Sequence, residues 1–156
     1  TTIPRYEELQ YILIENEELV LLTSKNTNLA CRIPNGTPIS ILEAKNESFI
    51  SNKVGHSVRA IQDNLFAAHN ISPKILLETA SIEIEKKVTI ACNAVMICPL
   101  NYIEKDENFR SQAHIYPLKD IDSKRHCYIC HRKDLYLAKY MRDFIRILSE
   151  VENPFL

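Results

Sequence analysis

The fold is decided by residues 47–98, which have the sequence ESFISNKVGHSVRAIQDNLFAAHNISPKILLETASIEIEKKVTIACNAVMIC. Three short apolar runs alternate here with two stretches whose apolar residues recur every three or four positions. In chain order these five segments are 47–51, 56–69, 74–79, 81–91 and 94–98. A β-α-β-α-β order with short links predicts parallel strands, right-handed crossovers and helices on both faces of an α/β sheet.

The flanking sequence predicts further elements. Apolar, β-prone residues predict strand at 11–14 and 17–23, whereas Pro34, Gly36 and Pro38 predict a loop or linker over 24–40. The remaining expected elements are a short helix from Pro99 to about Glu104, strands over 112–118 and 124–132, and a closing helix over 136–152. The closing helix has an apolar stripe of Leu137, Tyr140, Met141, Phe144, Ile145 and Leu148.

Composition excludes several classes of protein. The chain has 156 residues, a net charge of −1 and 46% hydrophobic residues, which is typical of one globular domain or two small lobes. The near-zero charge argues against nucleic-acid binding through a bulk positive field. Only two glycines are present, so GxGxxG, Walker and GxSxG loops cannot be formed. No apolar run approaches the ~18 residues of a membrane span.

The five cysteines predict free thiols in a reducing, cytoplasmic compartment, because an odd number cannot pair completely and no signal-peptide pattern precedes them. Cys127 and Cys130 form a CxxC pair flanked by His126 and His131. In a strand, residues three apart point to opposite faces, and no second ligand pair lies at zinc-module spacing. We therefore expect a strand without metal rather than a zinc site or a thioredoxin-like redox centre.

No catalytic constellation emerges from the sequence. The clustered carboxylates lie in polar stretches and are interpreted as solvated faces: Glu7-Glu8, Glu17-Glu18 and Glu83 with Glu85. His56 and Ser57 are adjacent, but no acid is placed to orient the histidine. We therefore expect no enzyme activity and no cofactor.

A ligand site is expected where parallel strands end, because ligands of open α/β sheets bind outside the carboxyl ends of the strands. The first candidate segment is NKVGHS, formed by Asn52, Lys53, Val54, Gly55, His56 and Ser57. The others run from Thr79 to Ser81 and from Cys98 to Leu100. The first segment leads into a helix N-terminus, whose free N–H groups favour anions. The alternative is an ordinary polar turn with a helix cap.

Taken in order, these segments resemble the C-terminal effector-binding domain of LysR-type bacterial transcriptional regulators. The resemblance covers nearly the whole chain. It is carried by Leu19–Leu22 with Asn28-Leu29-Ala30, Phe49-Ile50 with Arg59 and Asp63, the turn His69–Pro73, the ungapped run Glu78–Pro99, and Lys133–Leu148. Two family glycines correspond here to Cys92 and Ala94, and a family valine to Thr89. Asn93 is then the best residue to end the second helix in a left-handed conformation.

The resemblance implies a periplasmic-binding-protein-like fold of type 2, with a small-molecule inducer held between two α/β subdomains. Residues 24–118 would form the second subdomain, and residues 1–23 and 119–156 would be a remnant of the first. One wall of the inducer cleft would contain Asn52, Lys53, Val54, Gly55, His56, Thr79 and Pro99. The family also implies homodimers or tetramers, and DNA binding through an N-terminal winged helix-turn-helix that this chain lacks.

A periplasmic-type solute-binding protein is the main alternative, since it shares the architecture; a zinc- or thiol-dependent enzyme is a weaker one. If residues 1–23 and 119–156 are only a remnant of the first subdomain, a further expectation follows for the closing helix. An uncovered stripe on the closing helix would leave a large apolar patch in water. The chain is therefore expected to associate through that stripe and strand 17–23, or to exchange elements with a second copy. The alternative is that the stripe folds back onto strands 17–23 and 124–132.

Overall fold

The computed structural model describes residues 6–104, 106–120 and 124–152 of the chain. The chain divides into two compact units. Unit 1 consists of Thr1–Glu17 with Lys124–Leu156, and unit 2 consists of Glu18–Ser123. Residues 1–5 and 121–123, which fall in the predicted first subdomain, lie outside the described residues. Among the described residues, no helix is long and apolar enough to cross a membrane.

Unit 2 is built on a mixed sheet with the strand order β3-β2-β4-β1-β5. The strands are β1 (Leu9–Ser24), β2 (Ser48–Asn52), β3 (Lys74–Thr79), β4 (Val95–Pro99) and β5 (Ala113–Pro117). Strand β2 pairs in parallel with both β3 and β4, which confirms the parallel arrangement predicted for these three strands. The second part of β1 lies between β4 and β5 and is antiparallel to both.

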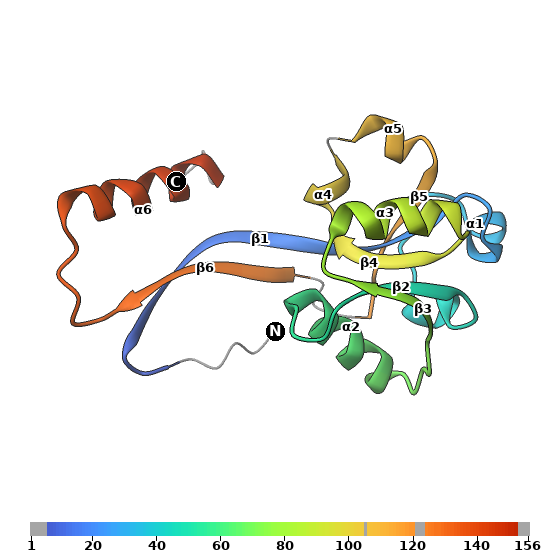
Figure 1. Cartoon of the computed structure of the whole chain (residues 1–156), viewed down its shortest axis with the longest axis horizontal. Coiled ribbons are helices and arrows are strands. Elements are labelled where there is room, and N and C mark those ends of the chain that lie inside the picture. The colour runs from blue at the N-terminus through green and yellow to red at the C-terminus, as the bar shows by residue number, and fades with distance from the viewer. Residues whose placement is uncertain (1–5, 105, 121–123, 153–156) are drawn as a thin grey trace. The chain divides into compact units, whose positions relative to one another are not determined.

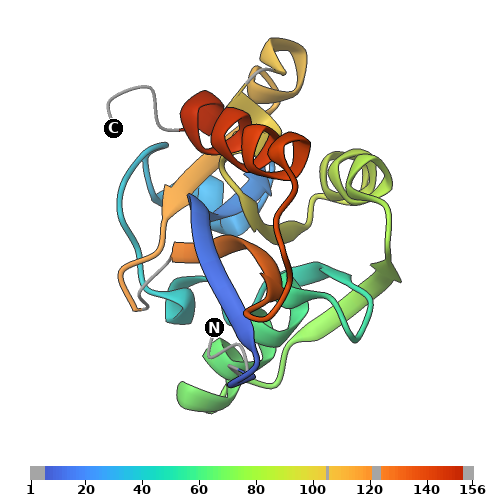
Figure 2. The same ribbon diagram turned by 90° about the vertical axis from the view of Figure 1, so that its left-hand side faces the viewer.

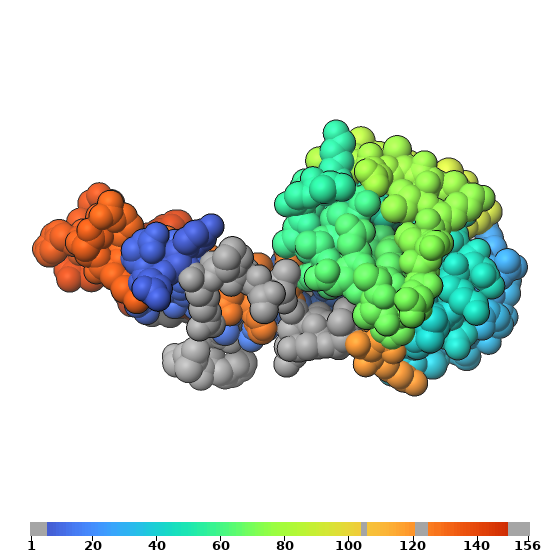
Figure 3. Space-filling view, turned by 90° about the horizontal axis from the view of Figure 1, so that it is seen from below, coloured from blue at the N-terminus to red at the C-terminus, as the bar shows by residue number. Residues whose placement is uncertain are grey.

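The two long helices of unit 2 cover opposite faces of the sheet, as Figure 1 shows: α2 (Ser57–Ala68) on one and α3 (Ile82–Ala91) on the other. Alternate residues of each strand point to opposite faces, so one strand serves two cores. Leu19, Leu21 and Phe49 pack with α2, whereas Val20, Leu22 and Ile50 pack on the α3 side. Figure 3 shows the outer surface of α2 and β3 in green.

Both helices end at asparagines with positive φ. Asn70 has φ 53° after α2, and Asn93 has φ 48° after α3. The predicted role of Asn93 is therefore confirmed, because asparagine tolerates the left-handed region better than most residues. Ser81 occupies the N-cap position of α3 as predicted, but its side chain makes no capping bond. Its N–H donates instead to Thr79 Oγ1 at 3.2 Å.

Two expectations about local structure were wrong. The predicted loop 24–40 contains α1 (Asn28–Arg32), because Thr27 caps it by accepting from the Ala30 N–H at 3.1 Å; η1 (Ile41–Ala44) follows this segment. Pro99 does not begin a helix but ends β4, and the short helix α4 (Asn101–Glu104) starts later. The Leu100 N–H donates to the Glu18 carbonyl at 2.9 Å, which extends the sheet contact past Pro99. A short α5 (Glu107–Arg110) comes before β5.

Unit 1 contains a two-stranded ribbon and a helix. Strand β6 (Lys124–Arg132) pairs with the first part of β1, and Figure 2 shows the two strands side by side. Tyr11 and Tyr128 meet edge to face across the ribbon, with ring centroids 6.1 Å apart. The closing helix is α6 (Lys139–Glu152) rather than 136–152, and Tyr140 and Phe144 of its stripe are 74% and 60% exposed.

Strand 17–23 cannot serve as the expected association surface. Its residues Leu19–Thr23 are paired with β4 on one side, and Val20–Thr23 are paired with β5 on the other. Both edges of Val20–Thr23 are therefore satisfied inside the sheet of unit 2, and these residues have no free edge for a second chain.

Candidate functional site

The predicted site residues meet at one edge of the unit 2 sheet. Asn52 at the end of β2 lies opposite Thr79 at the end of β3, and the Lys53 N–H donates to the Thr79 carbonyl at 3.1 Å. Ile50 lies opposite Met96, so β4 ends at the same edge with the buried Pro99. The carboxyl ends of three parallel strands thus converge, which is where ligands bind in such sheets.

The turn from Lys53 to His56 projects from this edge into solvent. The His56 N–H donates to the Lys53 carbonyl at 3.2 Å, and Gly55 has φ +99°, a conformation that L side chains rarely adopt. Val54 is 75% exposed, and Lys53, His56 and Ser57 are exposed as well. His56 is the N-cap of α2 but makes no side-chain capping bond, so the positive end of the helix is left without that partner.

Arg59, on the first turns of α2, holds the backbone of Asn52. Its Nη1 donates to the Asn52 carbonyl at 3.0 Å and to Glu78 at 2.6 Å, and its Nε donates to Asp63 at 2.8 Å. The hydrogen bond to Asp63, opposed by burial and aided by Glu78, raises the pKa of the Arg59 guanidinium. The arginine therefore ties the ends of β2 and β3 to α2.

Glu85 on α3 holds the side chain of Asn52. The Asn52 Nδ2 donates to the Glu85 carboxylate, which is only 1% exposed. Burial raises the pKa of Glu85 to about 7, against the hydrogen bond from Asn52, which lowers it. On β4 the buried Cys98 thiol has its pKa raised to about 12 by burial, with the charge of Glu85 as a second cause.

Sequence reasoning missed Arg59 and Glu85 as parts of the site. Interpreting Glu85 as part of a solvated face was wrong, because the buried face of α3 contains Glu85, Lys86 and Thr89 while Ile84 is 48% exposed. The apolar residues Ile82, Val88 and Ile90 do pack against the core, but Glu85 shares the buried side of the helix with them. The spacing of Arg59 and Asp63, four residues apart, was a signal for an ion pair but not for contact with Asn52.

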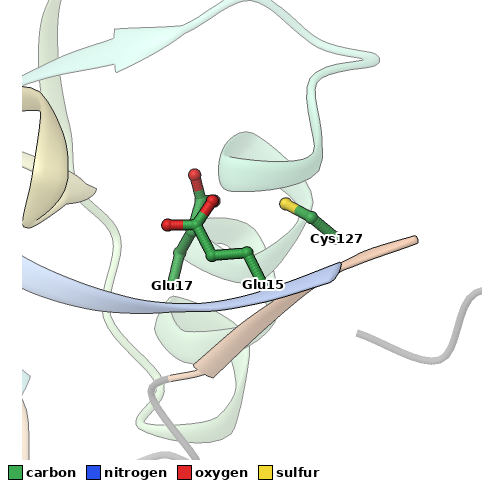
Figure 4. A group of neighbouring side chains, drawn as sticks. All are labelled: Glu15, Glu17 and Cys127. Carbon is green, nitrogen blue, oxygen red and sulfur yellow. The ribbon is translucent and has the colours of Figure 1, made fainter. Parts of the chain in front are cut away.

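A second cluster lies in unit 1, where ligand-type atoms of Glu15, Glu17 and Cys127 all lie within 4.8 Å of one another (Figure 4). Glu17, also first interpreted as solvated, is buried and forms an ion pair with Arg125. Burial, followed by the charge of Glu17, raises the pKa of the Cys127 thiol, which disfavours the thiolate that metals bind. We therefore interpret this cluster as an ion pair beside a protonated thiol.

The CxxC pair and its histidines do not converge. Cys127 and Cys130 belong to one continuous strand, as predicted, so their side chains lie on opposite faces. His126 Nδ1 is 2.5 Å from Asn16 Oδ1, and His131 Nδ1 is 2.9 Å from the Arg132 carbonyl. Of these four residues, only Cys127 takes part in the cluster with Glu15 and Glu17.

The fold and this strand-end site define an α/β ligand-binding domain, and comparison with known proteins identifies its family. A family model described as the LysR substrate binding domain matches residues 1–153. The chain belongs to this family, whose members are the ligand-sensing domains of LysR transcriptional regulators. This confirms the predicted family and favours a regulator over a solute-binding protein. Comparison with curated protein sequences finds no match.

Solved structures of LysR regulators share the fold. The regulatory domain of CcmR from Synechocystis PCC6803, in complex with 2-PG, superposes with a TM-score of 0.80 at 22% identity, over 99% of this chain and 73% of that one. The effector binding domain of QuiR, in complex with shikimate, superposes with a TM-score of 0.78 at 17% identity. The match covers 100% of this chain and 71% of that one. Full-length CbnR, complexed with its target DNA, superposes with a TM-score of 0.73 at 15% identity. The match covers 96% of this chain but only 50% of the CbnR chain. The predicted periplasmic-binding-protein-like α/β fold is thereby confirmed.

Proposed function

We propose that this domain binds a small-molecule effector at the edge where β2, β3 and β4 end. The observation that carries the proposal is the convergence of Asn52, Thr79 and the exposed turn 53–56 in a chain of this family. The structures of CcmR with 2-PG and QuiR with shikimate support the proposal, because these domains share the fold and hold small molecules. Ser57, Ser81 and Pro99 complete the proposed wall.

The chemistry of this edge favours an effector with an anionic group. Lys53 offers an ammonium, His56 an imidazole, and α2 the positive end of its dipole. The described residues of the Asn52–Ser57 turn include no acid to repel an anion. Glu78, one residue before the end of β3, accepts from Arg59, and Glu85 on α3 accepts from Asn52, so both carboxylates are already engaged.

Mapping by NMR tests the proposed site. We expect 2-PG, shikimate or benzoate, used as probes, to shift the backbone amide resonances of Asn52–Ser57 and Thr79–Ser81. Lys53→Ala and His56→Ala should weaken binding of the same probe without changing the thermal unfolding midpoint. Lys74→Ala is the matched control, since it removes an exposed lysine from the other end of β3. Shifts confined to that other end would contradict the proposal.

We further propose that the units correspond to effector subdomains: unit 2 to the second, predicted at 24–118, and unit 1 to part of the first, predicted at 1–23 and 119–156. DNA binding would belong to a winged helix-turn-helix elsewhere in the full regulator, as the DNA complex of full-length CbnR supports. Such a regulator would act in the bacterial cytoplasm.

We also propose that the domain forms a homo-oligomer. The exposed apolar side chains of α6 support this, since Tyr140 and Phe144 of the stripe and the nearby Ile147 are all more than half exposed in the single chain. Sedimentation velocity at micromolar concentration should show association that Phe144→Glu abolishes. Lys139→Glu, a charge change on an exposed residue outside the stripe, is the control. A monomer at all concentrations would contradict the proposal.

A further inference from the structure

Asn52 is held from both faces of the sheet. Its carbonyl accepts from Arg59 on α2, and its Nδ2 donates to Glu85 on α3. Since one end of the side-chain amide is engaged on the α3 side, the other end is constrained too. Its Oδ1 accepts no hydrogen bond from the described residues and is not buried. The half-buried amide therefore presents an unused acceptor at the end of β2.

Glu85 is suited to fix this orientation. The carboxyl is 1% exposed, and among the described residues Asn52 is its hydrogen-bond partner on β2. Lys86, the next residue, does not compete, because its Nζ is held by Asp106 at 2.8 Å and by Glu83 at 3.3 Å. An ionised carboxylate can only accept hydrogen bonds, so it binds the N–H end of the amide and not the oxygen.

We propose that Glu85 is a positioning residue that keeps Nδ2 of Asn52 turned toward α3, so that Asn52 offers Oδ1 to the effector. The effector would then carry a hydrogen-bond donor, a hydroxyl or ammonium group, in addition to its anionic group. This inference rests on the proposed function, since it assigns a ligand class to the same edge. Glu85 acts through Asn52 and does not itself touch the effector.

Protonation of Glu85 permits the reverse arrangement. A protonated carboxyl can donate to Oδ1 of Asn52, which would turn Nδ2 outward and present a donor instead. The groups facing Glu85 are the Cys98 thiol of β4 and Lys86 of its own helix, and α3 also packs against β3, whose charged residues are Lys74 and Glu78. Glu78 is paired with Arg59. Since the pKa of Glu85 is raised to about 7, both arrangements are accessible near neutral pH.

The orientation is tested without any ligand. We expect the side-chain amide resonances of Asn52 to shift between pH 5 and 9 with a midpoint near 7, and E85Q to remove that midpoint while the domain stays folded. E83Q is the matched control, because Glu83 is an exposed carboxylate on the same helix and should leave the midpoint in place. Asn52 resonances that do not titrate, or a midpoint retained in E85Q, would overturn the positioning role.

The ligand class is tested with matched probes at pH 8.5. Shikimate carries three hydroxyls and 3-hydroxybenzoate one, whereas cyclohexene-1-carboxylate and benzoate carry none. We expect hydroxylated probes to bind about two- to tenfold more tightly, which is the effect of one neutral hydrogen bond. N52L and E85L should abolish this preference.

Equal binding of both probe sets, or no shift of Asn52 by any hydroxylated probe, would overturn the ligand class. The two proposals fail separately. If probes shift the 52–57 turn but Asn52 does not titrate with Glu85, the function stands and the inference falls. If Asn52 titrates with Glu85 but the probes bind at the other end of the strands, the positioning role stands while the proposed function and the ligand class that rests on it fall.

Discussion

The two units of the chain differ in how many strands pair with β1 and in how deeply its residues are buried. In unit 2 a strand such as β1 has partners on both edges and cores on both faces, and Leu19–Leu22 are at most 1% exposed. In unit 1 the same strand continues as a ribbon with β6, and of its residues Leu9–Glu17 only Glu17 is buried. The amphipathic helix of unit 1, α6, leaves large side chains in water.

The difference shows what one chain must supply for a strand to be buried. A two-stranded ribbon is marginal in water, whereas three or more strands packed against a helix are stable. Unit 2 supplies five strands and a helix on each face from its own sequence. Unit 1 supplies one ribbon and one helix with an uncovered stripe, so its full stabilisation is expected to need further protein surface.

The largest expected effect separates two phenylalanines. Phe49→Ala in β2 should lower the free energy of unfolding by about 3–5 kcal/mol, because a fully buried ring that packs on Phe66 with centroids 4.9 Å apart is lost. Phe144→Ala in α6 should change it by less than about 0.5 kcal/mol at protein concentrations low enough for the domain to be monomeric, because that ring is 60% exposed in the single chain. Urea unfolding followed by circular dichroism measures both.

If Phe144→Ala lowered the free energy of unfolding as much as Phe49→Ala does, the contrast between the two units would not hold. Such a loss would mean that α6 is packed even in dilute solution, either against the ribbon of unit 1 or in an oligomer that persists at low concentration. Repeating the unfolding at several protein concentrations separates these two cases, because only an oligomer gives a stability that depends on concentration.

The second prediction concerns the buried carboxyl of unit 2. The folded-state pKa of Glu85 is raised to about 7 from 4.5, so between these values the folded chain holds a proton that the unfolded chain releases. The contribution of Glu85 to the free energy of unfolding therefore falls by up to about 3 kcal/mol as the pH rises from 4.5 to 7, and it then levels off. E85Q should remove this fall and be the more stable protein at pH 8.

Thermal or urea unfolding of both proteins at pH 5, 6, 7 and 8 measures the difference, in which the other titrating groups cancel. E83Q should follow the wild-type curve, since Glu83 is exposed. A constant difference between E85Q and wild type across this range would show that burial does not perturb Glu85.

The smallest expected effect is stabilising. Thr89 Oγ1 is the one buried side-chain polar atom among the described residues that has no hydrogen-bond partner. Thr89→Val should raise the free energy of unfolding by about 1 kcal/mol, because it removes an unpaired hydroxyl without changing the volume. Thr23→Val is the matched control and should lower it, since that hydroxyl is 2.6 Å from Thr27 Oγ1. Destabilisation by Thr89→Val would indicate a bound water at this hydroxyl.

Sequence periodicity predicted the elements of unit 2 well because each one is covered by the unit itself. The strand 74–79 matches β3, the helix predicted at 56–69 is one residue longer than α2 at each end, and the helix predicted at 81–91 begins one residue before α3. Periodicity failed where a single capping hydrogen bond determines whether a helix forms, as in α1, which is capped by the side chain of Thr27. It also failed at Pro99, where pairing of β4 with β1 prevails over the preference of proline for a first helical turn.

By itself the sequence determined the order of strands and helices, the parallel pairing of β2, β3 and β4, and the edge at which Asn52 and Thr79 lie. These follow from local periodicity and from the handedness of crossovers, which need no knowledge of distant contacts. Only the tertiary structure decided which carboxylates are buried. Glu17 and Glu85 lie in polar stretches of sequence, but Arg125 comes from β6 and Asn52 from β2. Burial and pKa are set by partners far along the chain, and no local pattern records them.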